Sequence, residues 1–209
     1  IVWTQALKPA PEEESGCNPP GVVVPTSSAL SGSTESGTPA PTSSAPSTTL
    51  GTFAGPDSLA TTRPADPSGI PLRVFNASTV TGQAKTLTDE LRAAGFASIG
   101  QQDNDPLYPA ADLRCYGEIR YGYGGLAEAR TTLIVAPCAQ LVLDDRLDNS
   151  VDLALGRLYQ VNPLTDEVKA QLAAIKDAAA PPPVIEGQTV VVRPPPPIPA
   201  LPDRSACPA

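Results

Sequence analysis

Two short turns hold the residues with the greatest capacity to bind a ligand. Each follows an apolar segment and is rich in small hydroxyl, amide or glycine residues, which leave backbone N–H groups accessible at the start of a helix. The second turn adds a guanidinium group and two phenol rings, so it could hold an anion by charge and a sugar or lipid head group by stacking. The candidate ligand-binding residues are Asn76, Ser78, Thr79, Thr81 and Gly82 in the first turn and Arg120, Tyr121, Gly122, Tyr123, Gly124 and Gly125 in the second.

The same residue types also have a purely structural interpretation. Ser and Thr cap helices, Gly permits tight turns, and Arg120 would then point into solvent. Residues 122–127 also match the dinucleotide-binding pattern G-x-G-x-x-G/A. That fold needs two β-α-β-α-β halves, and the sequence predicts one smaller unit instead.

Composition excludes several other kinds of chemistry. The chain has no histidine, which removes Ser-His-Asp triads and most catalytic zinc sites. The acidic residues Asp144, Asp145, Asp148 and Asp152 lack the spacing and the glycine of a calcium-binding loop, so they are interpreted as a solvated turn. We expect no metal and no cofactor. A net charge of −8 argues against a nucleic-acid partner.

The elements that must position the two turns fall within residues 70–160. Apolar spacing predicts strands at residues 72–76, 96–101, 118–121 and 151–155, and helices at residues 84–94 and 126–137. The order β-α-β-β-α-β predicts a small two-layer α+β domain of the split β-α-β type. In that arrangement the first and third strands are parallel neighbours, so both turns would face one another across a single edge of the sheet.

The two ends of the chain differ in composition from this domain. Residues 1–69 are rich in Ser, Thr and Pro and are predicted to be a disordered stalk, either glycosylated or a plain linker. Residues 161–180 predict a helix capped by Asn162, and residues 181–209 a Pro-rich tail in extended conformation. The apolar start at Ile1, followed by Val2 and Trp3, leads us to expect a membrane anchor upstream, with a random chain boundary as the alternative.

Four cysteines indicate disulfides and an oxidising compartment. In the expected topology the helix at residues 126–137 returns across the sheet, which brings Cys138 near Cys115. This favours a Cys115–Cys138 disulfide and, by elimination, a Cys17–Cys207 disulfide, although four cysteines allow three connectivities.

Three stretches resemble the LytR C-terminal domain family. They are VFNASTVTGQA at residues 74–84, IRYGYG at residues 119–124 and DLALG at residues 152–156. The paired cysteines and Pro-rich flanks are most similar to members that stand alone behind one membrane helix in actinobacteria, including mycobacteria. The resemblance implies a non-catalytic, virulence-associated role in cell-envelope integrity outside the cytoplasm. It also implies a partner such as a wall or lipid-linked glycan component, or an envelope-assembly protein such as a LytR-CpsA-Psr phosphotransferase.

Two other functions remain open from the sequence. One is a mechanical or adhesive surface protein in which the stalk carries the function. The other is an enzyme acting on a glycan or phosphate through Asp and Glu, although the pattern places no carboxylate pair at the ends of the central strands.

Overall fold

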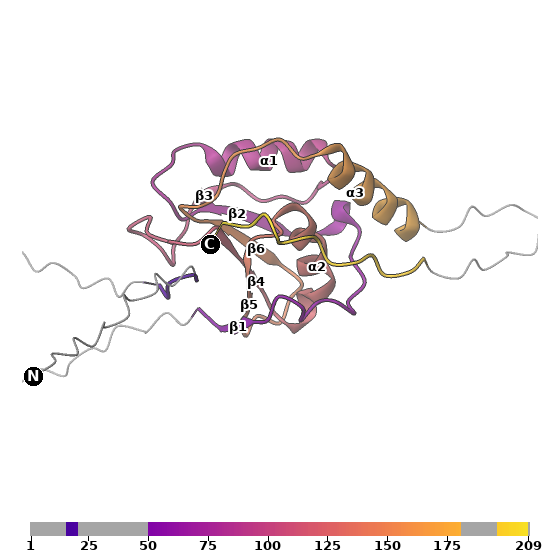
Figure 1. The fold of residues 1–209 in the computed structure, drawn as a ribbon, viewed down its shortest axis with the longest axis horizontal. Helices are drawn as coiled ribbons and strands as arrows, with labels where there is room; N and C mark the ends of the chain where they lie inside the picture. Colours follow the sequence, from indigo (N-terminus) through magenta and orange to yellow (C-terminus); the bar gives the residue numbers. More distant parts are fainter. Residues whose placement is uncertain (1–15, 21–49, 181–195, 209) are drawn as a thin grey trace, which may run out of the picture.

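The structure is a computed structural model that describes residues 16–20, 50–180 and 196–208, in which helices pack on a mixed sheet (Figure 1). The strands are β1 (Thr52–Ala54), β2 (Leu72–Asn76), β3 (Asp103–Asn104), β4 (Gly117–Tyr121), β5 (Gln140–Leu143) and β6 (Val151–Leu155). The helices are α1 (Gln83–Ala93), α2 (Leu126–Val135) and α3 (Asp166–Ala179), with short 3₁₀ turns at Pro67–Gly69 and Tyr123–Gly125.

The sheet has six strands in the order β1-β5-β4-β6-β2-β3. Two parallel pairs, β2 with β3 and β4 with β5, each enclose one helix in the chain. Strand β6 lies between these pairs, parallel to β2 and antiparallel to β4. The predicted α+β class is confirmed, but the strand order is not that of the split β-α-β arrangement.

One face of the sheet packs against the helices and forms the main core. Alternate strand residues such as Val74, Ile119 and Leu153 point to this face, as the two-residue period of a strand requires. They meet Leu87 and Leu91 of α1 and the apolar residues of α2. Helix α3 contributes the fully buried Leu172, so the C-terminal helix packs on the domain.

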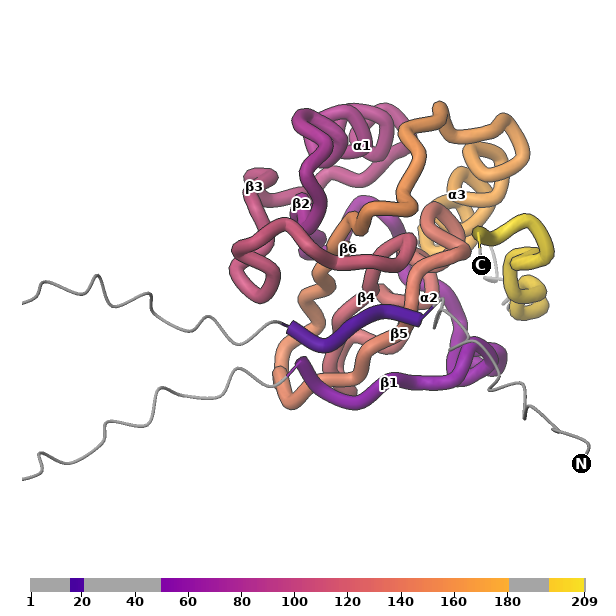
Figure 2. The backbone as a smooth tube through the Cα atoms, turned by 60° about the vertical axis from the view of Figure 1, so that its left-hand side comes forward, coloured from indigo at the N-terminus to yellow at the C-terminus, as the bar shows by residue number. Residues whose placement is uncertain are grey.

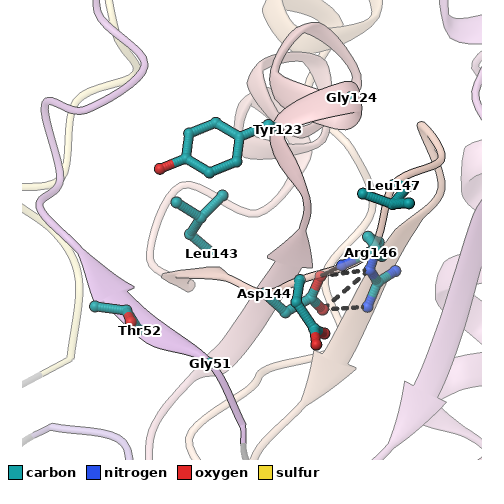
Figure 3. Close-up of a pocket in the computed structure, with 9 residues that line it drawn as sticks. Gly51, Thr52, Tyr123, Gly124, Leu143, Asp144, Arg146 and Leu147 are labelled. Carbon is teal, nitrogen blue, oxygen red and sulfur yellow. Dashed lines mark hydrogen bonds and ion pairs between the residues drawn. The ribbon is translucent and has the colours of Figure 1, made fainter.

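Strand pairing places the two candidate turns at opposite ends of the sheet. Asn76 pairs with Leu155, which in turn pairs with Gly117 at the start of β4. Tyr121, at the end of β4, pairs instead with Val151. The first turn therefore lies at one end of the sheet and Tyr123 and Gly124, which Figure 3 shows, lie at the other, so the expectation that the turns face one another is wrong. The physical reason is that β6 separates β2 from β4 and reverses the direction of β4.

Several element boundaries also differ from the sequence predictions. Residues 96–101 form only an isolated bridge at Ile99, and the edge strand is β3 at residues 103–104. Helix α3 is capped by Thr165, whose Oγ1 accepts from the Val168 N–H, rather than by Asn162. Residues 50–69 belong to the folded unit, because β1 pairs with β5 and Leu59 is fully buried. The predicted stalk and tail also include residues 1–15, 21–49, 181–195 and 209. These residues lie outside the described part of the chain.

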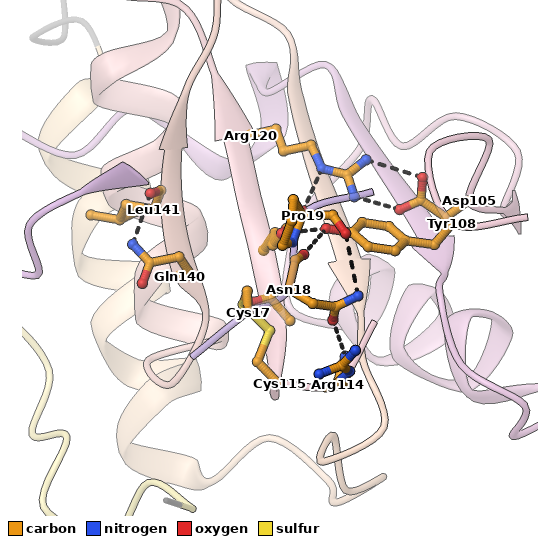
Figure 4. Close-up of a disulfide and its surroundings, with 12 residues drawn as sticks. Cys17, Asn18, Pro19, Asp105, Tyr108, Arg114, Cys115, Arg120, Gln140 and Leu141 are labelled. Carbon is orange, nitrogen blue, oxygen red and sulfur yellow. Dashed lines mark hydrogen bonds and ion pairs between the residues drawn. A yellow bond between two sulfur atoms is a disulfide. The ribbon is translucent and has the colours of Figure 1, made fainter. Parts of the chain in front are cut away.

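The other face of the sheet is covered by loops and by residues 16–20. Figure 2 shows this short segment, in indigo, running beside β4. Tyr108 and Leu113, from the loop after β3, are buried there with Ala154 of β6. Asn18 holds the segment in place, because its side-chain oxygen accepts from the Arg114 N–H at 2.7 Å (Figure 4).

The disulfides join Cys17 to Cys115 and Cys138 to Cys207, so the predicted pairs Cys115–Cys138 and Cys17–Cys207 are wrong. Cys115 and Cys138 do lie near the same end of the sheet, two residues before β4 and β5. However, Cys115 packs in the loop-face cluster with Cys17 and Ala154, whereas Cys138 follows α2 on the helix face. The sheet itself separates them, and each pairs with one end of the chain.

A buried charge cluster lies beneath residues 16–20. The Arg120 guanidinium donates to both carboxylate oxygens of Asp105, at 3.1 and 2.6 Å, and to Glu118 at 2.9 Å. The side chains of Asp105 and Glu118 are fully buried. The Tyr108 hydroxyl lies 2.6 Å from the Asn18 carbonyl oxygen and 2.9 Å from Glu118 Oε1, yet a phenol has one proton to donate. A protonated Glu118, which would donate to the phenol oxygen, satisfies both contacts.

The pKa of Glu118 agrees with this arrangement. Burial raises the pKa of the Glu118 carboxyl above its ordinary value of 4.5, and the charge and hydrogen bond of Arg120 only partly oppose the effect. The cluster therefore connects residues 16–20, which we call the cover segment, to the sheet through buried polar contacts.

The first prediction concerns Glu118→Gln, which imitates the protonated acid. The folded-state pKa is raised, so the contribution of Glu118 is most favourable below about pH 4.5 and decreases as pH rises toward its folded value. As pH rises, the free energy of unfolding of the variant should therefore increase relative to that of the wild type. The increase should be about 1.4 kcal/mol for each unit by which the folded pKa of Glu118 exceeds its unfolded pKa. Urea unfolding at pH 4, 6 and 8 measures this, with the exposed Asp57→Asn as control. A difference between Gln variant and wild type that is constant with pH would contradict a raised pKa.

The second prediction concerns the cover segment. Cys17→Ser combined with Cys115→Ser removes a crosslink between residues 98 positions apart and should lower the free energy of unfolding by about 2–5 kcal/mol. It should also raise hydrogen exchange at Arg114, whose N–H binds Asn18. Urea titration and exchange mass spectrometry check both effects. Unchanged exchange at Arg114 would show that Asn18 holds the segment without the disulfide.

Candidate functional site

An open surface pocket of about 580 Å³ lies at the carboxyl ends of β4 and β5. Residues from three segments line it: the start of β1, the turn after β4 and the loop after β5. In Figure 3 the ring of Tyr123 lies above Leu143, on the side toward Thr52. The lining residues are Gly51, Thr52, Tyr123, Gly124, Leu143, Asp144, Asp145, Arg146 and Leu147.

Tyr123 is the most accessible aromatic group of this pocket. Its exposed fraction is 77%, and that of the neighbouring Leu147 is 96%. The phenol ring is an exposed aromatic group beside an open pocket, where a ligand or partner can reach it.

The glycines around Tyr123 serve close packing of the backbone. A Cβ at Gly122 would collide with the Arg146 carbonyl oxygen, and one at Gly124 would lie 2.8 Å from the Leu147 carbonyl oxygen. The loop after β5 thus rests directly on the turn after β4. This packing fixes the backbone on either side of Tyr123, so the ring is presented from a defined support rather than from a free loop.

Arg146 is fully engaged in holding the same loop. Its guanidinium donates to both oxygens of Asp144, at 2.8 and 2.6 Å, and to Asp152 at 2.8 Å. Burial acts to lower the pKa of Arg146, but the hydrogen bonds to Asp144 and Asp152 raise it above its ordinary value. Asp152 also binds Arg73, at 2.6 Å, which extends the ion pairs across the sheet. Since Arg146 is already neutralised, it offers little free charge for an anionic ligand.

In the first candidate turn, the side chains of Asn76 and Ser78 are held by hydrogen bonds within the turn and to Gln83. Asn76 Oδ1 accepts from the Ser78 N–H and from Gln83 Nε2, at 3.1 and 2.9 Å, and Asn76 Nδ2 donates to the Val80 carbonyl. Ser78 is buried and binds Gln83 as well. Thr79, Thr81 and Gly82 are exposed, and Gly82 has a φ of +85° that favours glycine. These contacts support the structural interpretation of Asn76 and Ser78, which shape the entry into α1.

Arg120 and Tyr121 do not reach the pocket. Arg120 is buried in the charge cluster described above, on the loop face, and so points neither to a ligand nor to solvent. Tyr121 is buried in the main core. Of the sequence candidates, the structure brings Tyr123 and Gly124 into the pocket, with Gly122 and Gly125 as supports.

Other residues of the pocket and of the buried charge cluster were not predicted from the sequence. Thr52 and Leu147 line the pocket but came from segments interpreted as stalk and acidic turn. Asp105, Tyr108 and Glu118 surround Arg120, and an acidic residue two positions before a strand arginine is a signal that could have suggested the pairing. Within residues 16–20, 50–180 and 196–208 there is no cluster of potential metal ligands. None of the described helices is long and apolar enough to cross a bilayer.

Comparison with known proteins gives three agreeing results. The family described as LytR cell envelope-related transcriptional attenuator (LytR_C) matches residues 69–159. The chain is 36% identical over 184 residues to the cell envelope integrity protein Cei of Mycobacterium tuberculosis, covering 87% of this chain and 76% of that protein. It is also similar to the crystal structure of the soluble domain of a conserved hypothetical secreted protein from Mycobacterium marinum. That match has a TM-score of 0.58 and 36% identity, and it covers 65% of this chain and 90% of the other.

The matched region contains both candidate turns, and the similarity to the curated mycobacterial protein extends well beyond it. The predicted resemblance is confirmed: this chain belongs to the LytR C-terminal domain family.

Proposed function

We propose that this chain is a non-catalytic, extracytoplasmic binding module that supports cell-envelope integrity by holding an envelope glycan on the Tyr123 pocket. The observation that carries the proposal is the 77% exposed phenol ring over an open pocket. The name of the M. tuberculosis relative supports an envelope role. Two disulfides and the secreted relative from M. marinum support a location outside the cytoplasm.

The groups around Tyr123 favour an uncharged, hydroxyl-rich ligand. An aromatic face stacks on the C–H face of a sugar ring, and the Tyr123 ring is accessible for such a contact. Asp145 is exposed and lines the pocket, so its carboxylate can accept hydrogen bonds from sugar hydroxyls. Because Arg146 is bound by Asp144 and Asp152, the lining is negative rather than positive, which disfavours a phosphate at this position.

The same geometry supports binding without chemistry. Glycan hydrolysis needs two accessible carboxyl groups that flank the bond to be broken. Both oxygens of Asp144 accept hydrogen bonds from Arg146, and Glu118 and Asp105 are buried on the loop face away from the pocket. The residues that line the pocket therefore hold a ligand but provide no acid and base pair.

The third prediction tests the pocket directly. Tyr123→Ala should weaken binding of neutral oligosaccharides released from mycobacterial cell wall by about tenfold, since a stacked aromatic is worth about 1 kcal/mol or more. Tyr123→Phe should keep most of the affinity because it keeps the ring. Val80→Ala is the matched control, because Val80 is 50% exposed but lies at the opposite edge of the sheet. Isothermal titration calorimetry gives the affinities.

Two results would contradict the proposal. One is equal affinity of wild type and Tyr123→Ala for every oligosaccharide that binds. The other is absence of binding to neutral oligosaccharides together with binding of an envelope-assembly protein that Tyr123→Ala leaves intact.

A further inference from the structure

Two arginines on the helix face contact the end of the chain rather than acidic side chains. We call residues 196–208 the C-terminal strap. Arg130 of α2 donates through Nη2 to the carbonyl oxygens of Pro199 and Ala200, both at 2.9 Å. Arg63 donates through Nη1 to the Pro196 carbonyl oxygen at 2.7 Å. Leu201 packs against the main core, and Cys207 joins the strap to Cys138.

Arg130 is unusual for a buried cation. Its side chain is fully buried, and neither Arg130 nor Arg63 forms an ion pair with any residue among 16–20, 50–180 and 196–208. Arg130 Nε and Nη1 have no hydrogen-bond partner within that part of the chain. Burial lowers the pKa of Arg130 from its ordinary value. A buried guanidinium with two neutral carbonyl partners is energetically poor, since a charge removed from water needs an opposite charge or a full set of acceptors.

An apolar side chain would pack under the strap at lower cost, so packing alone does not explain an arginine at position 130. The contrast with Arg120 is informative, because that equally buried arginine is surrounded by two carboxylates. Among residues 16–20, 50–180 and 196–208, Arg130 instead retains unused N–H donors, which are the groups that bind phosphate and carboxylate oxygens. The carbonyl oxygens of the strap occupy part of the positions that such an anion would take.

We propose that Arg130, assisted by Arg63, is a binding site for a phosphate-bearing ligand, and that residues 196–203 of the strap compete with that ligand for the guanidinium groups. The disulfide at Cys207 keeps the strap close when its carbonyls are displaced. A competitor tethered in this way is present at a high effective concentration and lowers the apparent affinity of any ligand. This site is separate from the Tyr123 pocket and differs from it in charge, so either proposal can fail alone.

The fourth prediction uses inorganic pyrophosphate as the probe and the full chain with both disulfides. Leu201→Ser removes the apolar contact that holds the strap without adding a charge, and it should increase the affinity for pyrophosphate at least tenfold over wild type. Adding Arg130→Met should abolish this gain, and adding Arg63→Met should reduce it a few fold. Arg157→Met is the control, because Arg157 is exposed and makes no side-chain contact with the strap in the described structure. Calorimetry gives the affinities, and hydrogen exchange of residues 196–203 reports release of the strap.

Each outcome decides the proposal. Faster exchange of the strap in Leu201→Ser without a gain in pyrophosphate affinity would overturn it, as would a gain that survives Arg130→Met. If Leu201→Ser leaves the strap protected, Cys138→Ser combined with Cys207→Ser releases its other anchor, and a strap still protected there would show that it cannot be displaced. If pyrophosphate binds, vesicles with and without phosphatidic acid distinguish a lipid headgroup from a free phosphate compound as the source of that group.

A stability measurement on Arg130→Met alone separates a binding site from a structural arginine. A ligand site masked by the strap predicts that the variant keeps or gains stability, because a poorly satisfied buried charge is removed. A clear fall in the urea midpoint, as expected for a residue whose hydrogen bonds hold the strap, would overturn the proposal.

Discussion

Strand β6 is hydrogen-bonded to β2 on one side and to β4 on the other, and this double pairing determines which loops share an edge. Five residue pairs join β6 to each neighbour, and every residue of β6 is buried. A shift of one residue would move Leu153 to the loop face and Asp152 into the main core, so the register is strongly fixed. Because β4 runs antiparallel to β6 and β2 runs parallel to it, the carboxyl ends of β4 and β2 lie at opposite ends of the sheet. The pocket and the two disulfides consequently lie toward opposite ends of the sheet.

The loop face of the sheet shows how this small domain handles charge. Arg73, Asp152 and Arg120 lie in one row across β2, β6 and β4, and each ion pair on this face includes one of these residues or Arg146. Exposed pairs of this kind contribute little stability, but buried ones destabilise strongly when one partner is lost. The loop at residues 105–115 and the cover segment at residues 16–20 exclude water from Arg120. The burial of this charge cluster therefore depends in part on a segment about 100 residues away from β4 in the sequence.

The sequence identified the elements with clear periodicity but could not give their order in the sheet. Strands at residues 72–76 and 151–155 and helices α1 and α2 were predicted nearly to their observed ends, since two-residue and four-residue spacing is a local property. Strand β5 was missed because its four residues follow α2 and Cys138 without a break in composition. Strand β1 and residues 16–20 were missed because Ser, Thr and Pro dominate their surroundings. Neighbour relations between strands depend on long-range pairing, and no spacing within one strand encodes them.

The same limitation explains which site residues were correctly placed. Tyr123 could be predicted as exposed because glycines surround it and a turn lies on the surface. The burial of Arg120 could not, because its partners Asp105 and Tyr108 come from a loop with no regular pattern. The cysteine pairs failed for a related reason. The expected topology placed Cys115 and Cys138 correctly at one end of the sheet. It could not show that they lie on opposite faces.

The folding unit is larger than the region that matches the family. Residues 69–159 contain Cys115 and Cys138 but neither of their partners, and they lack β1, the cover segment and the C-terminal strap. A fragment with those limits would expose the Tyr108 and Glu118 side of the buried charge cluster and the guanidinium of Arg130. It would also leave Cys115 and Cys138 without their disulfide partners. Both thiols would lie near one end of the sheet, but on opposite faces of it. Residues 16–20 and 196–208 are therefore structural parts of this domain, each fixed by one disulfide, and the surfaces that they cover acquire their properties only when these residues are present.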